Sequence, residues 1–354
     1  MESASGVSEL EHAELRRRLW SIVGEWSAAY LDGHQYASAE ELRTRIRAVA
    51  SLVETNDPDH HLALAVRPLE TAAGRDFLIA AGWAREETFM VIGPRDGSHQ
   101  TLWSIANARR TLSAESAAAE ELKRWTDSSS GDAPISISAI ELLPPNGGRP
   151  RFYVDALNLP QIGLSRDAQI SIWEWTGERA ECLFIKSYPS HANTHRVTSA
   201  GNRLEIEVTP RPKTFHSCGS CAPLLQARWT LMVETHGVRD EGFDDQTAEI
   251  LLVDQVIHNA VNGHDLKGIA SPDVGRRLRE WMRPTDEDGR EDLGMGGVSS
   301  ERHKTRTTVL VRTDDWCLRF HLRDERNGSV VEDVEKLCQG LDCDALDCSR
   351  VPDP

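Results

Sequence analysis

The spacing of apolar residues changes along the chain, and this change constrains the fold more than any other feature. In the first third of the chain, apolar side chains recur mainly at the helical period of about 3.6 residues. From Ile135 onward, short runs alternate between apolar and polar residues, which is typical of antiparallel strands. The polar segment 126–134 between them predicts a linker. We therefore expect an α+β multidomain protein, helical first and β-rich afterwards.

Two helices are predicted at the start, each opened by a capping box of serine and glutamate. Ser8 opens the first helix, and Gly33 ends it. Ser38 opens the second helix, and Pro58 stops it because proline cannot continue a helix. The apolar stripe of the first helix comprises Leu15, Leu19, Ile22, Val23, Trp26 and Tyr30.

The remainder of the first segment predicts one strand between two helices. A shorter helix is expected from Arg75 to Ala81, ended by Gly82. The strand is expected at Glu87–Ile92 and is broken by the following Gly-Pro pair. A helical pattern then runs from Ser98 to about Trp125.

The second half predicts an antiparallel β-sandwich, because several short alternating strands are separated by turn residues. One hairpin is expected around a turn at Thr176 and Gly177, and another closes the domain. The segment Ala248–Val261 fits either a strand or a helix. The expected strands lie at Ile170–Trp175, Cys182–Ile185, Arg203–Val208, Arg228–Val233, Thr307–Val311 and Trp316–Leu322.

These patterns predict the domain boundaries. The expected parts are a disordered N-terminus at 1–8, a helical domain at 9–125, the linker, a β-rich domain at 135–330 with a mobile loop at 285–300, and a cysteine-containing tail at 331–354.

Charge and composition exclude several classes of function. The net charge is −16 and the densest basic run lies in a predicted helix, so neither nucleic-acid nor membrane-surface binding is expected. Seven cysteines do not form a disulfide framework. No secretory signal and no spanning segment is recognised. A cytoplasmic or nuclear protein is therefore expected.

The run Phe77–Pro94 has the order apolar helix, glycine-aromatic corner, acidic step, hydrophobic strand and proline. In this order the first segment, about residues 10–112, resembles a PUB domain. That module begins peptide:N-glycanase and occurs in other partners of the valosin-containing AAA ATPase. The resemblance implies a helical α/β domain that binds the C-terminal tail of the ATPase, and thus an adaptor in ubiquitin-proteasome quality control.

The resemblance also implies which residues line the tail-binding groove. Pro58 takes the place of the family's Asn-Pro corner, which puts Arg67 at an arginine and Glu70 at an asparagine of the family. His60 and His61 are polar candidates beside the corner. An acidic tail requires cationic partners of this kind.

The sharpest chemical motif contains His216, Cys218 and Cys221. A C-x-x-C pair suits zinc or redox chemistry, but it is more often structural, and no cofactor is expected. As an alternative, the three residues are ligands of a structural zinc.

A second alternative is a divergent amidase similar to peptide N-glycanase, with Cys218 or Cys221 as the nucleophile. The base is then His236 or His258, and Asp254 or Asp273 orients it. The leading interpretation is a non-enzymatic adaptor in which the PUB-like domain binds a peptide and the β-sandwich holds a second partner.

Overall fold

The computed structural model describes residues 9–50, 63–71, 74–83, 86–105, 135–158, 165–191, 194–210, 214, 225–282, 297–303, 306–312, 316–325 and 328–339. The described residues form two compact units. The first unit comprises those up to residue 191 together with 197–205 and 231–240. The second unit comprises the others.

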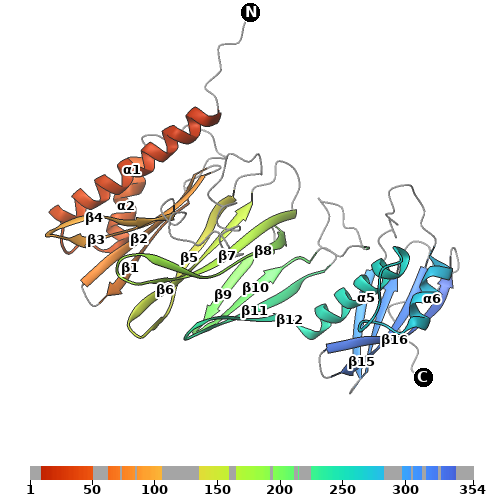
Figure 1. Cartoon of the computed structure of the whole chain (residues 1–354). Helices are drawn as coiled ribbons and strands as arrows, with labels where there is room; N and C mark the ends of the chain where they lie inside the picture. Colours follow the sequence, from red (N-terminus) through yellow and green to blue (C-terminus); the bar gives the residue numbers. More distant parts are fainter. Residues whose placement is uncertain are drawn as a thin grey trace, which may run out of the picture. The chain divides into compact units, whose positions relative to one another are not determined.

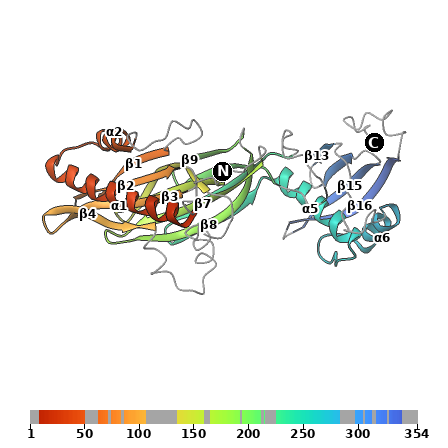
Figure 2. The same cartoon turned by 90° about the horizontal axis from the view of Figure 1, so that it is seen from above.

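The first unit begins with two helices that cover one face of an antiparallel sheet (Figures 1 and 2). The helices are α1 (Glu9–Gly33) and α2 (Ala39–Ala50). The sheet has the order β1-β2-β3-β4, with the strands β1 (Ala63–Thr71), β2 (Gly74–Trp83), β3 (Glu86–Arg95) and β4 (Ser98–Ser104).

A second antiparallel sheet packs against the other face of the first. Its order is β5-β6-β7-β8, with the strands β5 (Ile135–Asn146), β6 (Arg149–Asn158), β7 (Ser165–Trp175) and β8 (Ala180–His191). The first unit therefore stacks helices, sheet and sheet as layers, and strand β2 lies between two cores.

Alternate residues of β2 enter different cores, because side chains alternate between the faces of a strand. Phe77 and Ile79 pack against the helices. Leu78 and Ala80 pack against the β5–β8 sheet. The core between the two sheets is aromatic, with Phe89 5.3 Å from Trp103 and 5.3 Å from Trp173 between ring centroids. Both faces of β2 are thus buried.

A third sheet has the order β12-β11-β10-β9. In β10 every second residue is buried, namely Leu204, Ile206 and Val208, so the sheet presents one apolar face. The strands are β9 (Arg196–Ala200), β10 (Arg203–Val208), β11 (Ala227–Glu234) and β12 (Gly237–Phe243).

The second unit repeats the plan of two helices followed by four antiparallel strands. Asp244 and Ser271 cap its two helices by accepting hydrogen bonds from Thr247 N and Val274 N. The helices pack on one face of the β13-β14-β15-β16 sheet. The elements are α5 (Asp245–Val261), α6 (Pro272–Trp281), β13 (Gly297–His303), β14 (Arg306–Arg312), β15 (Trp316–Glu325) and β16 (Gly328–Gln339).

Several local predictions are confirmed. The two N-terminal helices are α1 and α2, and the cap at Ser38 accepts a 3.1 Å hydrogen bond from Glu41 N. The segment Ala248–Val261, whose sequence fits either a strand or a helix, is helical and lies within α5. The strands predicted at Glu87–Ile92, Ile170–Trp175, Cys182–Ile185, Arg203–Val208, Arg228–Val233, Thr307–Val311 and Trp316–Leu322 lie in β3, β7, β8, β10, β11, β14 and β15.

The predicted fold class, a helical PUB-like α/β domain followed by a β-sandwich, is wrong. The predicted helix Arg75–Ala81 is strand β2, and the helix predicted from Ser98 begins as strand β4. The run that carries the family resemblance is therefore a pair of antiparallel strands. A strand buried on both faces shows no alternation of apolar and polar residues. Its continuous apolar run therefore cannot be distinguished from a buried helix by periodicity.

The predicted N-terminus at 1–8 and linker at 126–134 lie outside the described residues. Within the predicted loop 285–300, strand β13 begins at Gly297. Within the predicted tail 331–354, β16 continues to Gln339.

Candidate functional site

A cluster of buried and half-buried polar side chains lies on the β5–β8 sheet of the first unit. Strands β5 and β6 are joined by Gly147 and Gly148, which have φ values of +57° and +82°. Two consecutive residues of positive φ make a tight hairpin turn that non-glycine residues adopt with difficulty. The turn brings Asn146 opposite Arg149. Farther along β6, Arg151 lies opposite Glu174 of β7.

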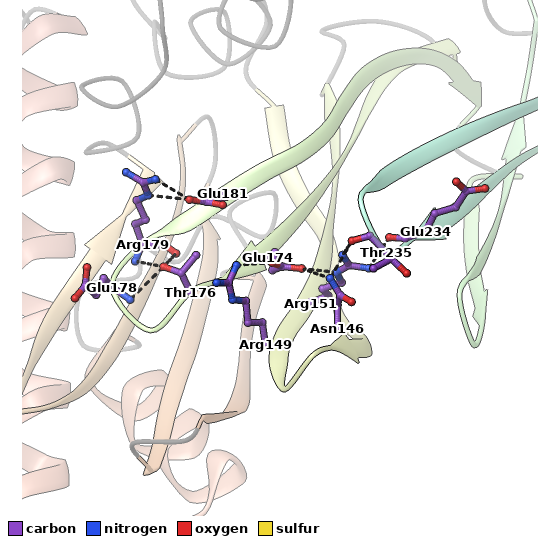
Figure 3. Close-up of polar contacts among 10 residues, drawn as sticks. All are labelled: Asn146, Arg149, Arg151, Glu174, Thr176, Glu178, Arg179, Glu181, Glu234 and Thr235. Carbon is purple, nitrogen blue, oxygen red and sulfur yellow. Dashed lines mark hydrogen bonds and ion pairs between the residues drawn. The ribbon is translucent and has the colours of Figure 1, made fainter.

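Arg151 is buried, and its guanidinium connects Glu174 of β7 to the turn between β11 and β12 (Figure 3). Nε donates to Glu174 Oε2 at 2.8 Å. Nη1 donates to the carbonyl of Glu234 at 2.7 Å, and Nη2 donates to that of Thr235 at 2.8 Å. Asn146 Nδ2 adds a 2.9 Å hydrogen bond to the Thr235 carbonyl. The cluster therefore fastens the turn between β11 and β12 to the β5–β8 sheet, and we call it the Arg151 clamp.

Glu174 is the anion of the Arg151 clamp. Burial alone would raise its pKa, but hydrogen bonds from Arg151, Asn146 and Arg149 outweigh burial and lower the pKa. An ionised carboxylate with three such donors is a poor proton acceptor. The clamp is therefore suited to holding a turn rather than to acid–base chemistry.

Next to the clamp, the β7–β8 turn is closed by its own polar groups (Figure 3). Thr176 Oγ1 accepts from the backbone N of Arg179 at 3.2 Å, and Thr176 N donates to the Arg179 carbonyl at 3.0 Å. The turn predicted at Thr176 and Gly177 is thereby confirmed.

A second buried carboxylate, Asp155, lies on β6. It accepts a 2.6 Å hydrogen bond from Tyr188 Oη and another from Ser138 Oγ. Burial, followed by the charge of Asp155, raises the pKa of Tyr188 far above its ordinary value. The tyrosine therefore remains protonated and serves as a hydrogen-bond donor across the sheet.

A third buried carboxylate, Asp76, joins the two stacked sheets. Its Oδ2 accepts a 2.7 Å hydrogen bond from Trp175 Nε1. Burial raises the pKa of Asp76, and the bond from Trp175 opposes this effect. Gly93 makes room for the carboxylate, because a Cβ at that position would lie 2.0 Å from Asp76 Oδ1.

The residues predicted to line a peptide groove lie on strand β1. Arg67 Nη2 pairs with Glu141 Oε1 at 2.6 Å, and Glu70 Oε1 pairs with Arg75 Nε at 2.7 Å. Both side chains are thus engaged in ion pairs within the chain. His60 and His61 lie outside the described residues.

The predicted zinc ligands and nucleophile, His216, Cys218 and Cys221, also lie outside the described residues. Within the described part of the chain, no three His, Cys, Asp or Glu side chains are grouped as metal ligands would be.

The other residues predicted for the amidase have local roles. His258 lies on α5, with its ring 5.9 Å from that of His264. Asp273 lies in the first turn of α6, where Arg276 hydrogen-bonds to it and lowers its pKa. Asp254 accepts a 2.8 Å hydrogen bond from Thr214 N, and His236 lies in the β11–β12 turn.

The sequence analysis places Trp26 and Tyr30 in the apolar stripe of the first helix but does not identify the stacked rings that they form on α1. Trp26 stacks on Tyr30 with centroids 5.4 Å apart, and Tyr30 stacks on His34 at 4.2 Å. Ile22, a member of the predicted apolar stripe, is 56% exposed. We call Ile22, Trp26, Tyr30 and His34 the α1 row. The four-residue spacing in the sequence is the signal that could have revealed it.

No protein-family model and no curated protein matches the chain. One solved structure aligned with it is a putative oxidoreductase (glucose dehydrogenase) from Thermus thermophilus. The alignment covers 78% of this chain and 88% of that chain, at 15% sequence identity and a TM-score of 0.21. A score this low establishes no common fold. In the part of the chain that is described, no helix is long and apolar enough to cross a membrane.

Proposed function

We propose that this chain is a non-enzymatic adaptor that binds other proteins through its surface. The observation that carries the proposal is that the buried carboxylates described above accept hydrogen bonds from other parts of the chain. Asp76, Asp155 and Glu174 each accept hydrogen bonds that join strands within the first unit. Glu249 and Asp254 accept bonds from Thr307 and Thr214 within the second unit. Carboxylates held in this way support the fold.

Catalytic groups are usually arranged differently. A catalytic acid or base needs a perturbed pKa and a free path to a substrate. Asp76 has a raised pKa, but Trp175 Nε1 binds one carboxylate oxygen, and the other faces Gly93. The ionisable groups described above therefore favour a scaffold over an active site.

The experiment that tests the proposal compares the alkylation rates of all seven cysteines near neutral pH, by peptide mapping of the full chain. Burial raises the pKa of the Cys182 thiol to about 12, and Cys317 is fully buried, so both serve as slow references. An adaptor is expected to show no cysteine with an activated thiolate. Rapid alkylation of Cys218 or Cys221, with loss of an amidase activity, would instead establish the hydrolase.

The C-terminal tail of the valosin-containing AAA ATPase remains a predicted partner. Titration of the full chain with that tail peptide tests it, with Arg67→Ala as the groove variant. Because Arg67 is paired with Glu141, a Glu141→Gln variant is the matched control that frees the guanidinium without removing it. Binding that is lost in Arg67→Ala and retained in Glu141→Gln would support this partner.

A further inference from the structure

Two cysteines occupy facing positions on the last two strands of the second unit. Strand β16 comes last in the sheet order β13-β14-β15-β16 and pairs with β15 in antiparallel register. The final pair of this register is Trp316 opposite Gln339. One position before it, Cys317 lies directly opposite Cys338. The cysteine pair therefore lies near the end of the ladder, where β16 also ends.

A β-bulge determines which residue faces Cys317. Next to the cysteine pair, Leu318 lies opposite Lys336. An unbroken ladder would therefore put Leu337 opposite Cys317. The register instead shifts by one residue at this point, so that Cys338 takes the facing position. Bulges are specific features that redirect single residues, and this one aligns the two cysteines.

The register of β16 before the bulge is fixed by contacts with the helices. Val331 and Val334 are fully buried in the core of the second unit. The backbone N of Val331 donates a 2.9 Å hydrogen bond to the carbonyl of Ile269. Arg277 Nη1 of α6 donates to the carbonyl of Val334 at 2.7 Å. A slip by one residue would turn both valines away from the core, so the alignment of β15 with β16 is strongly specified.

The spacing of facing positions suits a disulfide. Residues directly opposite each other in antiparallel strands have Cα atoms about 4.5 or 5.5 Å apart. The two Cα atoms that a disulfide connects are usually about 4.4–6.8 Å apart, so both kinds of facing position fall within this range. Cys317 carries a fully buried thiol. A disulfide to the facing residue of β16 is therefore compatible with the backbone of the two strands.

We propose that Cys317 and Cys338 form a reversible disulfide that fastens the end of β16 to β15, with oxidised glutathione as the oxidant. One cysteine thiolate attacks the glutathione disulfide, forms a mixed disulfide and releases one glutathione thiolate. The second cysteine thiolate displaces the other glutathione. The protein thus loses two electrons and two protons, and two glutathione thiols take them up.

Local opening at the end of a strand gives glutathione access to the pair, so the exchange does not require the unit to unfold. The disulfide then suppresses this opening. The proposal does not rest on the adaptor function, because it concerns only how two strands of the second unit are joined.

The test treats the reduced full chain with a series of glutathione redox buffers, blocks the remaining thiols and maps the peptides by mass spectrometry without reduction. We expect a peptide that links Cys317 to Cys338, lighter by two hydrogen atoms than its reduced parts, and its loss on addition of dithiothreitol. Amide hydrogen exchange at the end of β16 should become roughly tenfold slower or more in the oxidised protein, because the cross-link opposes opening.

Cys338→Ala should abolish the slower exchange, whereas Cys182→Ala, which removes a cysteine of β8 in the first unit, should retain it. A chain that stays reduced, that stops at the mixed disulfide or that links Cys338 to a different cysteine would overturn the proposal. So would a Cys317–Cys338 link that forms only in urea. The peptide map is made on the parent chain, so this result does not depend on the folding of either variant.

Discussion

At the scale of single residues, the buried charges of the described residues are held by hydrogen bonds within the chain. Arg151 illustrates this, since it contacts one carboxylate and two backbone carbonyls. A buried ion costs several kcal/mol to desolvate, and only such a complete set of bonds offsets that cost. The consequence is that removing Arg151 takes a hydrogen bond from one buried carboxylate and from two backbone carbonyls.

Arg151→Ala is therefore expected to destabilise the protein by about 3–5 kcal/mol. The measurement is the midpoint of urea unfolding. Arg149→Ala is the control, because Arg149 also pairs with Glu174 but its side chain is 57% exposed. That exposed pair should contribute about 0–1 kcal/mol. Equal losses in the two variants would contradict the assigned role of Arg151.

Glu174 and Asp76 should give opposite pH dependences. The pKa of Glu174 is lowered on folding, so its stabilisation is present above its unfolded pKa and is lost as the pH falls through its folded pKa. The pKa of Asp76 is raised on folding, so the folded state binds more protons and stability falls as the pH rises through that window.

Asp76→Asn is expected to remove the second of these dependences while keeping an acceptor for Trp175 Nε1. The measurement is the free energy of unfolding of both proteins from acidic to neutral pH. The variant should gain stability relative to the parent as the pH rises. Parallel curves for the two proteins would show that Asp76 does not titrate on folding.

At the scale of elements, strand β2 is the central element of the first unit. It contributes to the helical core through Ile79 and to the core between sheets through Leu78, both nearly fully buried. A strand with one solvated face tolerates substitution on that face, whereas β2 has no such face.

Leu78→Ala and Ile79→Ala should therefore each cost about 2–5 kcal/mol, although the two positions are adjacent. Urea unfolding of the two single variants checks this, with the exposed Glu70→Ala of β1 as the control. Tolerance of either β2 substitution would mean that the corresponding face is not packed.

At the scale of the whole molecule, the two compact units have separate hydrophobic cores. We therefore expect the unfolding of the chain to depart from a single two-state transition, with one cooperative transition for each unit. The adaptor proposal is compatible with this arrangement, since separate units can hold separate partners.

Calorimetry is expected to show two heat-unfolding transitions. Leu78→Ala should lower the midpoint of one, and Ile257→Ala in α5, which removes a fully buried side chain of the second unit, should lower the other. A single transition shifted by both variants would contradict independent units.

The sequence by itself determined the features whose causes lie within a few residues. The helices α1, α2 and the cap at Ser38 follow from local spacing and capping. The β7–β8 hairpin follows from alternation and from the turn at Thr176 and Gly177. These signals act between residues that are close in the sequence, so they can be recognised without knowledge of the fold.

Only the tertiary structure decided the fold of β2 and the make-up of the polar clusters. Strand β2 looks helical in sequence because two separate layers bury its two faces. The bonds of Arg151 reach 83 and 84 residues along the chain, to Glu234 and Thr235, and Asp76 reaches Trp175 over 99 residues. No local pattern specifies such pairs, because they arise when sheets stack and bring distant strands into contact.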